Sequence, residues 1–280
     1  MSPIIKAGNF SFDISRPLLM GIVNVTPDSF SDGGKFFSQE SAINHALKLH
    51  EEGADILDVG GESTRPDADD VSEDEELRRV IPIIEALVKK NIPVSIDTQK
   101  TVVMREAVAA GACLINDVNA LQAEGAMDVA AQSKAALCIM HRQGSAKTMQ
   151  QNPTYNDVVK EVKEFLQARA EVALTNNIEA SRIILDPGFG FGKKKVHNLN
   201  LLKHLQELAG LGYPILVGLS RKRLLGELTG REPDARLAAS ITAAVVAVQN
   251  GASIVRVHDV AATKDALAVI SALSSINSKA

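Results

Sequence analysis

The sequence predicts an α/β protein, a (β/α)8 TIM barrel with a short N-terminal hairpin. One unit recurs along the chain: an apolar run rich in β-branched residues, a polar junction, and a segment with apolar residues spaced three and four apart. Eight such units in 280 residues fit the strand number and length of this barrel, and predict one domain over residues 1–280. An open doubly wound sheet alternates in the same way, but more often has about five or six strands.

The expected strands are bounded by polar or turn-forming residues. They are Leu18–Thr26, Asp55–Gly60, Val94–Thr98, Leu114–Val118, Ala136–His141, Ile183–Pro187, Ile215–Ser220 and Ser253–Asp259. Several helical segments end in Gly-Ala, as in "EEGAD", "AAGAC" and "QNGAS", where glycine suits a left-handed C-terminal position. The segment "IIKAGNFSFDIS" alternates weakly, and we expect it to form a hairpin that caps the lower end of the barrel.

Composition narrows the functional classes. The net charge of −4 argues against non-specific nucleic-acid binding, which requires a basic face. Cys113 and Cys138 lie in apolar surroundings outside any C-x-x-C pair, so we expect reduced core thiols. The N-terminus lacks signal-peptide features, and no run approaches the roughly 20 apolar residues that span a bilayer. These features predict a cytoplasmic protein.

Polar groups stand at the expected strand ends, where barrels carry their chemistry. The ends read Asn24; Asp58 with "GGESTRP"; Asp97; Asn116 with Asp117; "MHRQG"; Asp186 with "LDPGFGFG"; "GLSRK"; and "RVHD". A single aspartate there usually caps the next helix. Polar residues at all eight ends are better explained by a shared ligand site, because unpaired buried polar groups are costly.

The residue types indicate a ligand with two different ends. The carboxylate and amide groups of Asp97, Asn116 and Asp186 match a heterocycle edge with a ring N–H and an exocyclic amine. Positive charge or donors for an anion come from Arg65, Lys222, Arg256 and His258. We therefore expect a donor-rich heterocycle joined to a phosphate, although other ligands fit the same groups.

Two familiar motifs are absent on inspection. "DPGFGFGKK" has Pro187 where a Walker A loop needs glycine and Lys194 where it needs Ser or Thr, and its glycine spacing is not G-x-G-x-x-G. These glycines are better explained by close backbone approach or loop motion. The six histidines form no H-x-H or H-E-x-x-H pair, which argues against a zinc site.

The motifs together resemble the dihydropteroate synthase family over nearly the whole chain. The resemblance rests on "GIVNVTPDSFSDGG", "DVGGESTRP", "SIDT", "NDV", "MHRQG" with "TMQQNPTY", "LDPGFGFGK", "LSRK" and "RVHDV", in this order at successive strand ends. It implies a barrel that condenses 7,8-dihydropterin-6-ylmethyl diphosphate with 4-aminobenzoate, giving 7,8-dihydropteroate and pyrophosphate. Both partners are small molecules, and the resemblance also implies a homodimer.

The resemblance also implies roles for individual residues. The implied pterin-binding set is Asp97, Asn116, Met140, Asp186, Phe191, Lys222 and Arg256. The implied diphosphate ligands are Asn24, Thr64, Arg65, Arg256 and His258, with Asn24 also a ligand of Mg²⁺. The implied aminobenzoate contacts are Phe30, Thr64, Pro66, Ser220 and Lys222. Without the family pattern, ordinary turn, cap or core roles would carry more weight for these residues.

The catalytic set implied by the resemblance is Asp28, Phe30, Lys222 and Arg256. Mg²⁺, Arg256 and His258 would stabilise departing pyrophosphate, which favours a dissociative substitution. The loop after Asn24 would then bring Asp28 near the cation and Phe30 over it to exclude water. 4-Aminobenzoate is a weak neutral nucleophile, so its positioning matters more than its deprotonation, and no general base is evident.

Three positions depart from the family pattern, namely Asp67, Arg142 and Lys194, and none is an expected ligand. The competing interpretations are a pterin-binding methyltransferase domain, an inactive paralogue and a non-catalytic pterin-binding protein. "NVTPDSFSDGG" with "LSRK" favours the synthase, since these segments are expected to serve diphosphate and aminobenzoate. The helix "LAASITAAVVAVQNGA" is apolar over most of its circumference, in keeping with a homodimer or with tight packing on the barrel.

Overall fold

The computed structural model describes residues 4–25, 35–63, 70–144 and 148–277. Its central sheet has the strand order β8-β7-β6-β5-β4-β3-β10-β9, with parallel pairing throughout. A parallel bridge between Leu185 and Ile215 joins the two ends of this order, and the Leu185 amide donates to the Pro214 carbonyl at 2.9 Å. The sheet therefore closes into the predicted barrel.

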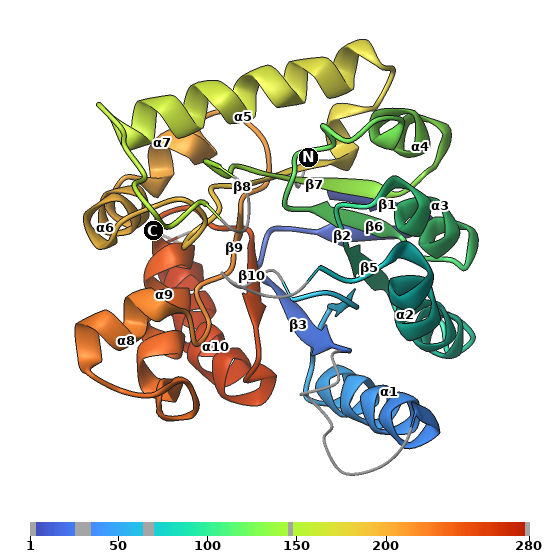
Figure 1. Ribbon diagram of the computed structural model, residues 1–280. Coiled ribbons are helices and arrows are strands. Elements are labelled where there is room, and N and C mark those ends of the chain that lie inside the picture. Colours follow the sequence, from blue (N-terminus) through green and yellow to red (C-terminus); the bar gives the residue numbers. More distant parts are fainter. Residues whose placement is uncertain (1–3, 26–34, 64–69, 145–147, 278–280) are drawn as a thin grey trace.

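All eight predicted strands form. They are β3 (Leu18–Asn24), β4 (Ile56–Gly60), β5 (Val94–Asp97), β6 (Leu114–Asp117), β7 (Ala136–Met140), β8 (Ile183–Asp186), β9 (Leu216–Val217) and β10 (Ile254–Val257). The helices that surround them are α1 (Lys35–Glu51), α2 (Glu73–Val88), α3 (Thr101–Ala109), α4 (Ala126–Gln132), α5 (Val158–Thr175), α6 (Lys195–Lys203), α7 (Leu205–Ala209), α8 (Arg223–Thr229), α9 (Leu237–Gln249) and α10 (Val260–Asn277) (Figure 1).

Local sequence explains where these helices begin and end. Asp157 caps α5 by accepting the amides of Val159 and Lys160. The three predicted Gly-Ala ends share one geometry: glycine has a positive φ, and the next alanine amide donates to the carbonyl five residues back, as from Ala54 to Leu49. This termination lets the next strand begin within a few residues.

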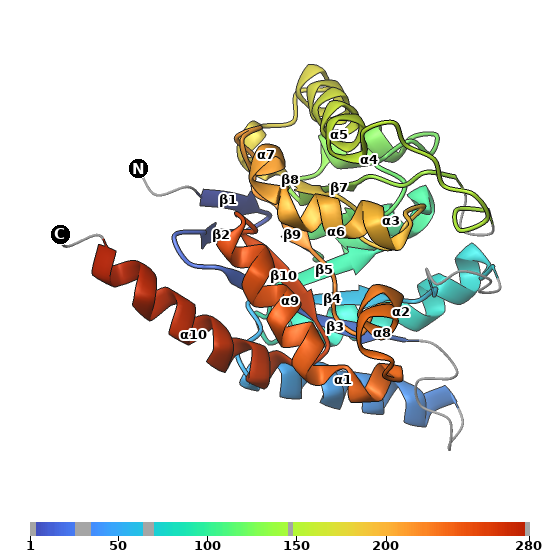
Figure 2. The ribbon, with the colours of Figure 1, turned by 90° about the vertical axis from the view of Figure 1, so that its left-hand side faces the viewer.

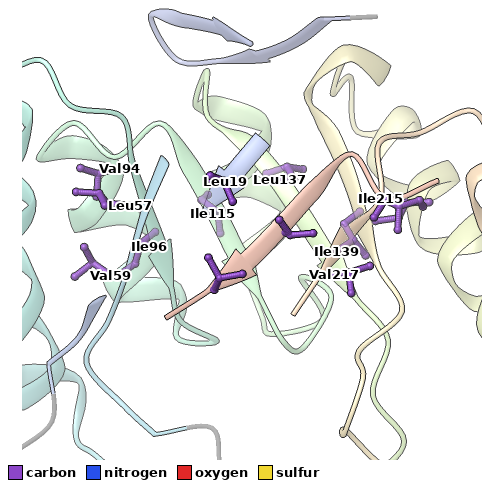
Figure 3. Packing of buried hydrophobic residues seen from close by; sticks show 14 of the residues in the cluster. Leu19, Leu57, Val59, Val94, Ile96, Ile115, Leu137, Ile139, Ile215 and Val217 are labelled. Atoms are coloured by element: carbon purple, nitrogen blue, oxygen red, sulfur yellow. The ribbon is translucent and has the colours of Figure 1, made fainter. Parts of the chain in front are cut away.

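The strands alternate between two environments, because successive side chains point to opposite faces. One set points outward and packs under the helices, including Leu19, Leu57, Val59, Val94, Ile96, Ile115, Leu137, Ile139, Ile215 and Val217 (Figure 3). The other set points inward and fills the lower half of the barrel with Leu18, Met20, Ile56, Leu114, Ala136, Cys138, Ile184, Leu216 and Ile254. The lower interior is therefore a packed apolar layer.

The predicted hairpin covers this lower layer. Strands β1 (Ile4–Ala7) and β2 (Phe10–Asp13) pair antiparallel, and they lie at the end of the barrel away from α8 (Figure 2). Ile5 and Ala7 are fully buried against the inward-pointing residues, and the Gly8 amide donates to the Lys134 carbonyl at 2.8 Å. The lower end is closed, so the C-terminal ends of the strands form the open end.

No helix in the described part of the chain is long and apolar enough to span a membrane. The barrel and its hairpin match the fold predicted from the sequence. Cys113 and Cys138 are both buried free thiols, as expected.

Replacing Ile5 with Ala should reduce the free energy of unfolding by about 2–5 kcal/mol, because it removes a side chain that is 1% exposed from a packed layer. Ile4, its neighbour on the hairpin, is 52% exposed, so Ile4→Ala should change stability by no more than about 0.5 kcal/mol. Denaturant unfolding of both variants measures the difference. Equal effects would show that the hairpin does not contribute to the barrel interior.

Candidate active site

The inward positions at the open end carry polar groups instead of apolar ones. The strand alternation places there Asn24, Asp58, Asp97, Asn116, Met140, Asp186 and Arg256. Asp117 has the opposite orientation and accepts the backbone amides of Asn119 and Leu121, so it shapes the following turn. The structure therefore brings the predicted strand-end residues together and excludes Asp117 from the mouth.

Arg256 bridges two carboxylates across the barrel. Its Nε donates to Asp58 Oδ2 at 2.5 Å, and its Nη2 donates to Asp97 Oδ2 at 2.6 Å. Asn116 Nδ2 donates to the same Asp58 oxygen at 3.1 Å. Side chains from four strands are thereby joined in one network, and the guanidinium plane is fixed by two bonds.

Burial and neighbouring charges shift the pKa values of the ionisable groups in this network. Burial raises the pKa of Asp97 to about 7, with Arg256 opposing the shift and Asp58 adding to it. Burial alone would lower the pKa of Arg256, but the Asp58 and Asp97 carboxylates hold it above its usual value. The Oδ1 atoms of Asp58 and Asp97 are buried and have no hydrogen-bond partner among the residues that the structure describes. Such atoms are rare in folded proteins, and they would accept donors from a bound ligand.

Asp186 and Lys222 form a second polar pair at the mouth. Asp186 Oδ1 accepts the Gly188 amide at 2.7 Å, and burial raises the Asp186 pKa, with Lys222 opposing. Lys222 Nζ donates to the Phe189 carbonyl at 2.6 Å and lies 4.6 Å from the Phe191 ring centroid. Burial lowers the Lys222 pKa to about 8. Backbone and ring, not a carboxylate, hold this ammonium.

The loop that follows β8 passes close to the end of β7. A Cβ at Gly188 would overlap the His141 carbonyl oxygen, and a Cβ at Gly192 would overlap the Gln143 carbonyl oxygen. Both glycines also have positive φ angles. Tyr155 Oη donates to the Gly192 carbonyl at 2.8 Å. At Gly188 and Gly192 these contacts confirm the close backbone approach expected for the glycines of "GFGFG".

Ser220 and His258 lie beside each other at the ends of β9 and β10. The Ser220 Oγ accepts the His258 amide at 3.2 Å and lies 3.0 Å from His258 Nδ1. Arg221 follows with φ of 56° and holds Asp259 through two bonds of 2.7 and 3.1 Å. The Arg221–Asp259 pair fixes the backbone that carries Ser220 and Lys222, at the cost of a strained residue.

Asn24 ends β3, half-buried, at the expected strand tip. No group of three or more His, Cys, Asp or Glu residues that could hold a metal occurs in the described ranges. A single amide oxygen still fits Mg²⁺, which commonly takes one or two protein oxygens and completes its shell with substrate phosphate and water. The residues present therefore fit a metal brought in with a diphosphate.

Several predicted residues lie outside the described ranges. They are Asp28, Phe30, Thr64, Arg65 and Pro66, together with the variant position Asp67. Residues 61 and 62, which follow β4, are held by hydrogen bonds. Arg79 donates to the Gly61 carbonyl at 2.7 Å, and Lys100 bridges Glu62 and Glu76 at 2.9 and 2.5 Å.

Sequence reasoning missed two residues. The sequence identifies Asp58 only as a strand end, although a carboxylate inside the apolar run "ILDVG" indicates an inward polar contact. Lys193 belongs to the glycine-rich segment "LDPGFGFGK", and no sequence signal distinguishes it from Lys194 beside it. Two of the positions that depart from the family pattern are also described. Arg142 donates to Gln99 and Asn119, and Lys194 is exposed, so neither joins the hydrogen-bond network around Arg256.

The arrangement can bind a molecule with two chemically different parts. Carboxylate and amide acceptors on β4, β5, β6 and β8 suit a heterocycle rich in N–H donors. Donors from Arg256, Lys222 and His258 suit an anion. The walls that could receive a flat ring are Met140, which is 3% exposed, and Phe191.

Comparison with known proteins finds relatives that match nearly the whole chain. Residues 20–258 match the family described as pterin binding enzyme. The dihydropteroate synthase of Haemophilus influenzae is 50% identical over 264 residues, covering 94% of this chain and 96% of the relative. A solved structure of the Xanthomonas albilineans dihydropteroate synthase with 4-aminobenzoic acid has a TM-score of 0.93 and 52% identity, covering 98% of this chain and 99% of that chain.

A second Xanthomonas albilineans structure, in complex with 7,8-dihydropteroate, has a TM-score of 0.89 and 50% identity, covering 97% of this chain and 99% of that chain. Both solved structures therefore cover nearly the whole chain. The chain belongs to the pterin-binding enzyme family, and within it to the dihydropteroate synthases.

Proposed function

We propose that this chain condenses 7,8-dihydropterin-6-ylmethyl diphosphate with 4-aminobenzoate to give 7,8-dihydropteroate and pyrophosphate. The observation that carries the proposal is the buried set of acceptors and cations at the barrel mouth, centred on Arg256 between Asp58 and Asp97. Relatives solved with 4-aminobenzoic acid and with 7,8-dihydropteroate support the choice of substrates.

The pterin ring binds through its donor-rich edge. Asp186 accepts from the 2-amino group and N3–H, and Lys222 donates to the carbonyl on the opposite side. Asp97 and Asn116 complete the set, with Met140 and Phe191 as apolar walls. The unpartnered buried Oδ1 of Asp97 supports this role, because a ligand donor would relieve its desolvation.

The diphosphate lies toward β3 and β10. Asn24, Arg256 and His258 bind it, with Thr64 and Arg65 from the loop after β4. A guanidinium has five N–H donors, and the bonds to Asp58 and Asp97 use two of them, so Arg256 can also cover the ring and reach an anion. Asn24 would hold Mg²⁺ together with the diphosphate, and the ion would supply positive charge to neutralise the leaving group.

Bond breaking precedes attack in the proposed route. Arg256 and His258 stabilise the departing pyrophosphate, and the pterin spreads the positive charge left on its methylene. The buried carboxylates on β4, β5 and β8 support this route, since negative groups around the pocket stabilise a cation. Asp28 stabilises it further and Phe30 excludes water. Aminobenzoate, placed by Phe30, Thr64, Pro66, Ser220 and Lys222, then attacks.

A cytoplasmic location and a homodimer stay predictions. Helix α9 buries Ser240, Ala243, Ala244 and Ala247 along one stripe, while Leu237 at its start is 43% exposed. This exposed residue supports a contact with a second copy without requiring one.

The deciding experiment measures pyrophosphate release from the pterin diphosphate and Mg²⁺, with and without 4-aminobenzoate. Release that requires aminobenzoate, together with formation of dihydropteroate, supports the proposed reaction. Tight pterin binding without turnover would instead favour a methyltransferase-like or non-catalytic pterin-binding protein. A chelator added to the assay tests the metal, and full activity without Mg²⁺ would remove it from the proposal.

Replacing Asp186 with Ala should weaken binding of the pterin diphosphate by about 1.5–3 kcal/mol, or roughly 10- to 150-fold, because a charge-assisted pair is lost. Calorimetric titration measures the affinity. Asp117→Asn is the matched control, since this strand-end aspartate bonds the turn at Asn119 and Leu121 and should leave affinity unchanged. Affinity in the Asp186 variant equal to that of the parent would remove Asp186 from the ring-edge role.

Pterin affinity should decline as the pH rises above about 8, because Lys222 loses the proton that it donates and its pKa is about 8. Above that pH the ammonium is progressively lost, and affinity should fall by up to about tenfold per pH unit. The same titration on Lys222→Gln corrects for ionisation of the ligand itself. A pH response shared by parent and variant would show that Lys222 is not the responsible group.

Phe30→Ala should slow the aminobenzoate step while leaving affinity for the pterin diphosphate mostly intact, because the ring is proposed to act after the anion is bound. Turnover at varied aminobenzoate and calorimetric pterin binding separate the two effects, and Phe30→Leu keeps an apolar side chain as a control. An equal loss of pterin affinity would contradict the loop assignment.

A further inference from the structure

The ammonium of Lys193 is buried at the end of the loop between β8 and α6. The residue is 3% exposed. Its Nζ lies 2.9 Å from the Gly188 carbonyl oxygen, 3.0 Å from that of Phe191 and 3.2 Å from that of His141. A fourth contact, at 2.9 Å, is to His141 Nδ1. Four acceptors from two segments of chain therefore converge on one cation.

The direction of these bonds follows from the chemistry of the groups. An ammonium has donors and no acceptor, so His141 Nδ1 must accept, and the ring proton lies on Nε2. Burial lowers the His141 pKa to about 3, and the Lys193 charge acts in the same direction, so the ring stays neutral. Burial lowers the Lys193 pKa to about 7, Asp186 opposes this shift, and the carbonyl oxygens around Nζ favour the charged form.

The loop that Lys193 holds carries the contacts of the pterin set. The Gly188 amide donates to Asp186, the Phe189 carbonyl accepts from Lys222, and the Phe191 ring lies beneath the Lys222 ammonium. The carbonyls of Gly188 and Phe191, on either side of Phe189, are the ones that Lys193 binds. A shift of this segment would therefore move the groups that place Lys222.

Neutral side chains hold the same loop at other points. Gln150 donates to the Gly190 carbonyl at 2.5 Å, and Asn198 Oδ1 accepts the Gly190 amide at 2.8 Å. Lys193 differs from them because it joins three carbonyls at once and ties the loop to the end of β7. Removing its donors would leave those carbonyl oxygens buried without this partner, which is costly for the local conformation.

We propose that Lys193 is a positioning residue for pterin binding: its buried ammonium fixes the 188–191 backbone, which in turn places Phe191 and Lys222 beside Asp186. This inference rests on the proposed function of the site. Lys193 itself does not contact substrate; it acts through the carbonyls of Gly188 and Phe191 and through the ring of His141.

The test compares Lys193→Met, which keeps the length of the side chain without its donors, with Lys193→Gln, which keeps two donors. The control is Lys194→Met, an equal change of charge at an exposed neighbour whose bond to His197 comes from its backbone amide. Lys193→Met should raise the Kd for the pterin diphosphate about tenfold or more. The Gln variant should fall between it and the parent, and Lys194→Met should stay within about twofold of the parent.

Comparing the effect of the variant on the two substrates distinguishes a loss of positioning from a general disruption of the active site. At saturating pterin diphosphate, the KM for 4-aminobenzoate in Lys193→Met should rise by a smaller factor than the Kd for the pterin diphosphate, because both substrates share Lys222 but the aminobenzoate contact Ser220 lies outside the loop that Lys193 holds. Parent-like pterin affinity in Lys193→Met, or an equal loss for both substrates, would overturn the proposal. If the Met variant does not fold, the same comparison is made with Lys193→Gln.

The ring of His141 gives an independent readout. Nitrogen NMR of the parent protein should show Nδ1 without a proton and Nε2 with one, and Lys193→Gln should shift the Nδ1 signal. A proton on Nδ1 in the parent would overturn the proposal, because Lys193 could not then donate to it. A parent without turnover whose pterin affinity still depends on Lys193 would contradict the proposed reaction and leave this inference standing.

Discussion

The site depends on one buried ion bridge, in which Arg256 joins Asp58 and Asp97. Removing three charges from water is expensive, and mutual attraction compensates only where geometry and further hydrogen bonds are good. Here the bonds are 2.5 and 2.6 Å, and Asn116 adds a third to Asp58. Compensation is incomplete within the described part of the chain, since one oxygen of each carboxylate has no hydrogen-bond partner there. The protein thus holds polar groups whose desolvation a ligand can relieve.

The fold makes this bridge possible by dividing the barrel into two layers. The lower interior is apolar and is sealed by Ile5 and Ala7 of the hairpin, while the upper interior carries the charges. Parallel strands bring side chains that are distant in sequence to the same end of the barrel, as with Arg256 and Asp58, 198 residues apart. Burial of the apolar lower layer stabilises the strands. The same strands carry the buried charges of the upper layer, whose desolvation is unfavourable.

Periodicity was sufficient to predict the barrel, because eight buried strands and their helices each leave a local pattern. It also placed Asp97, Asn116 and Asp186 at one end, since parallel strands share a direction. It could not show which partner each charge takes. Asp58 became part of the bridge only through contacts across the barrel, and Lys193 was distinguished from Lys194 only by the fold, which buries one and exposes the other.

How the two lysines are held bears on how the site recognises its ligand. Lys222 Nζ bonds a backbone carbonyl and faces an aromatic ring, and Lys193 Nζ bonds three carbonyls and a neutral imidazole. Neither cation forms a described salt bridge with Asp186, whose described bond is to the Gly188 amide. Their charge still favours the ionised carboxylate through space. Within the described contacts, no cation is bonded to the Asp186 carboxylate, which can therefore accept the two N–H groups of the proposed ring edge.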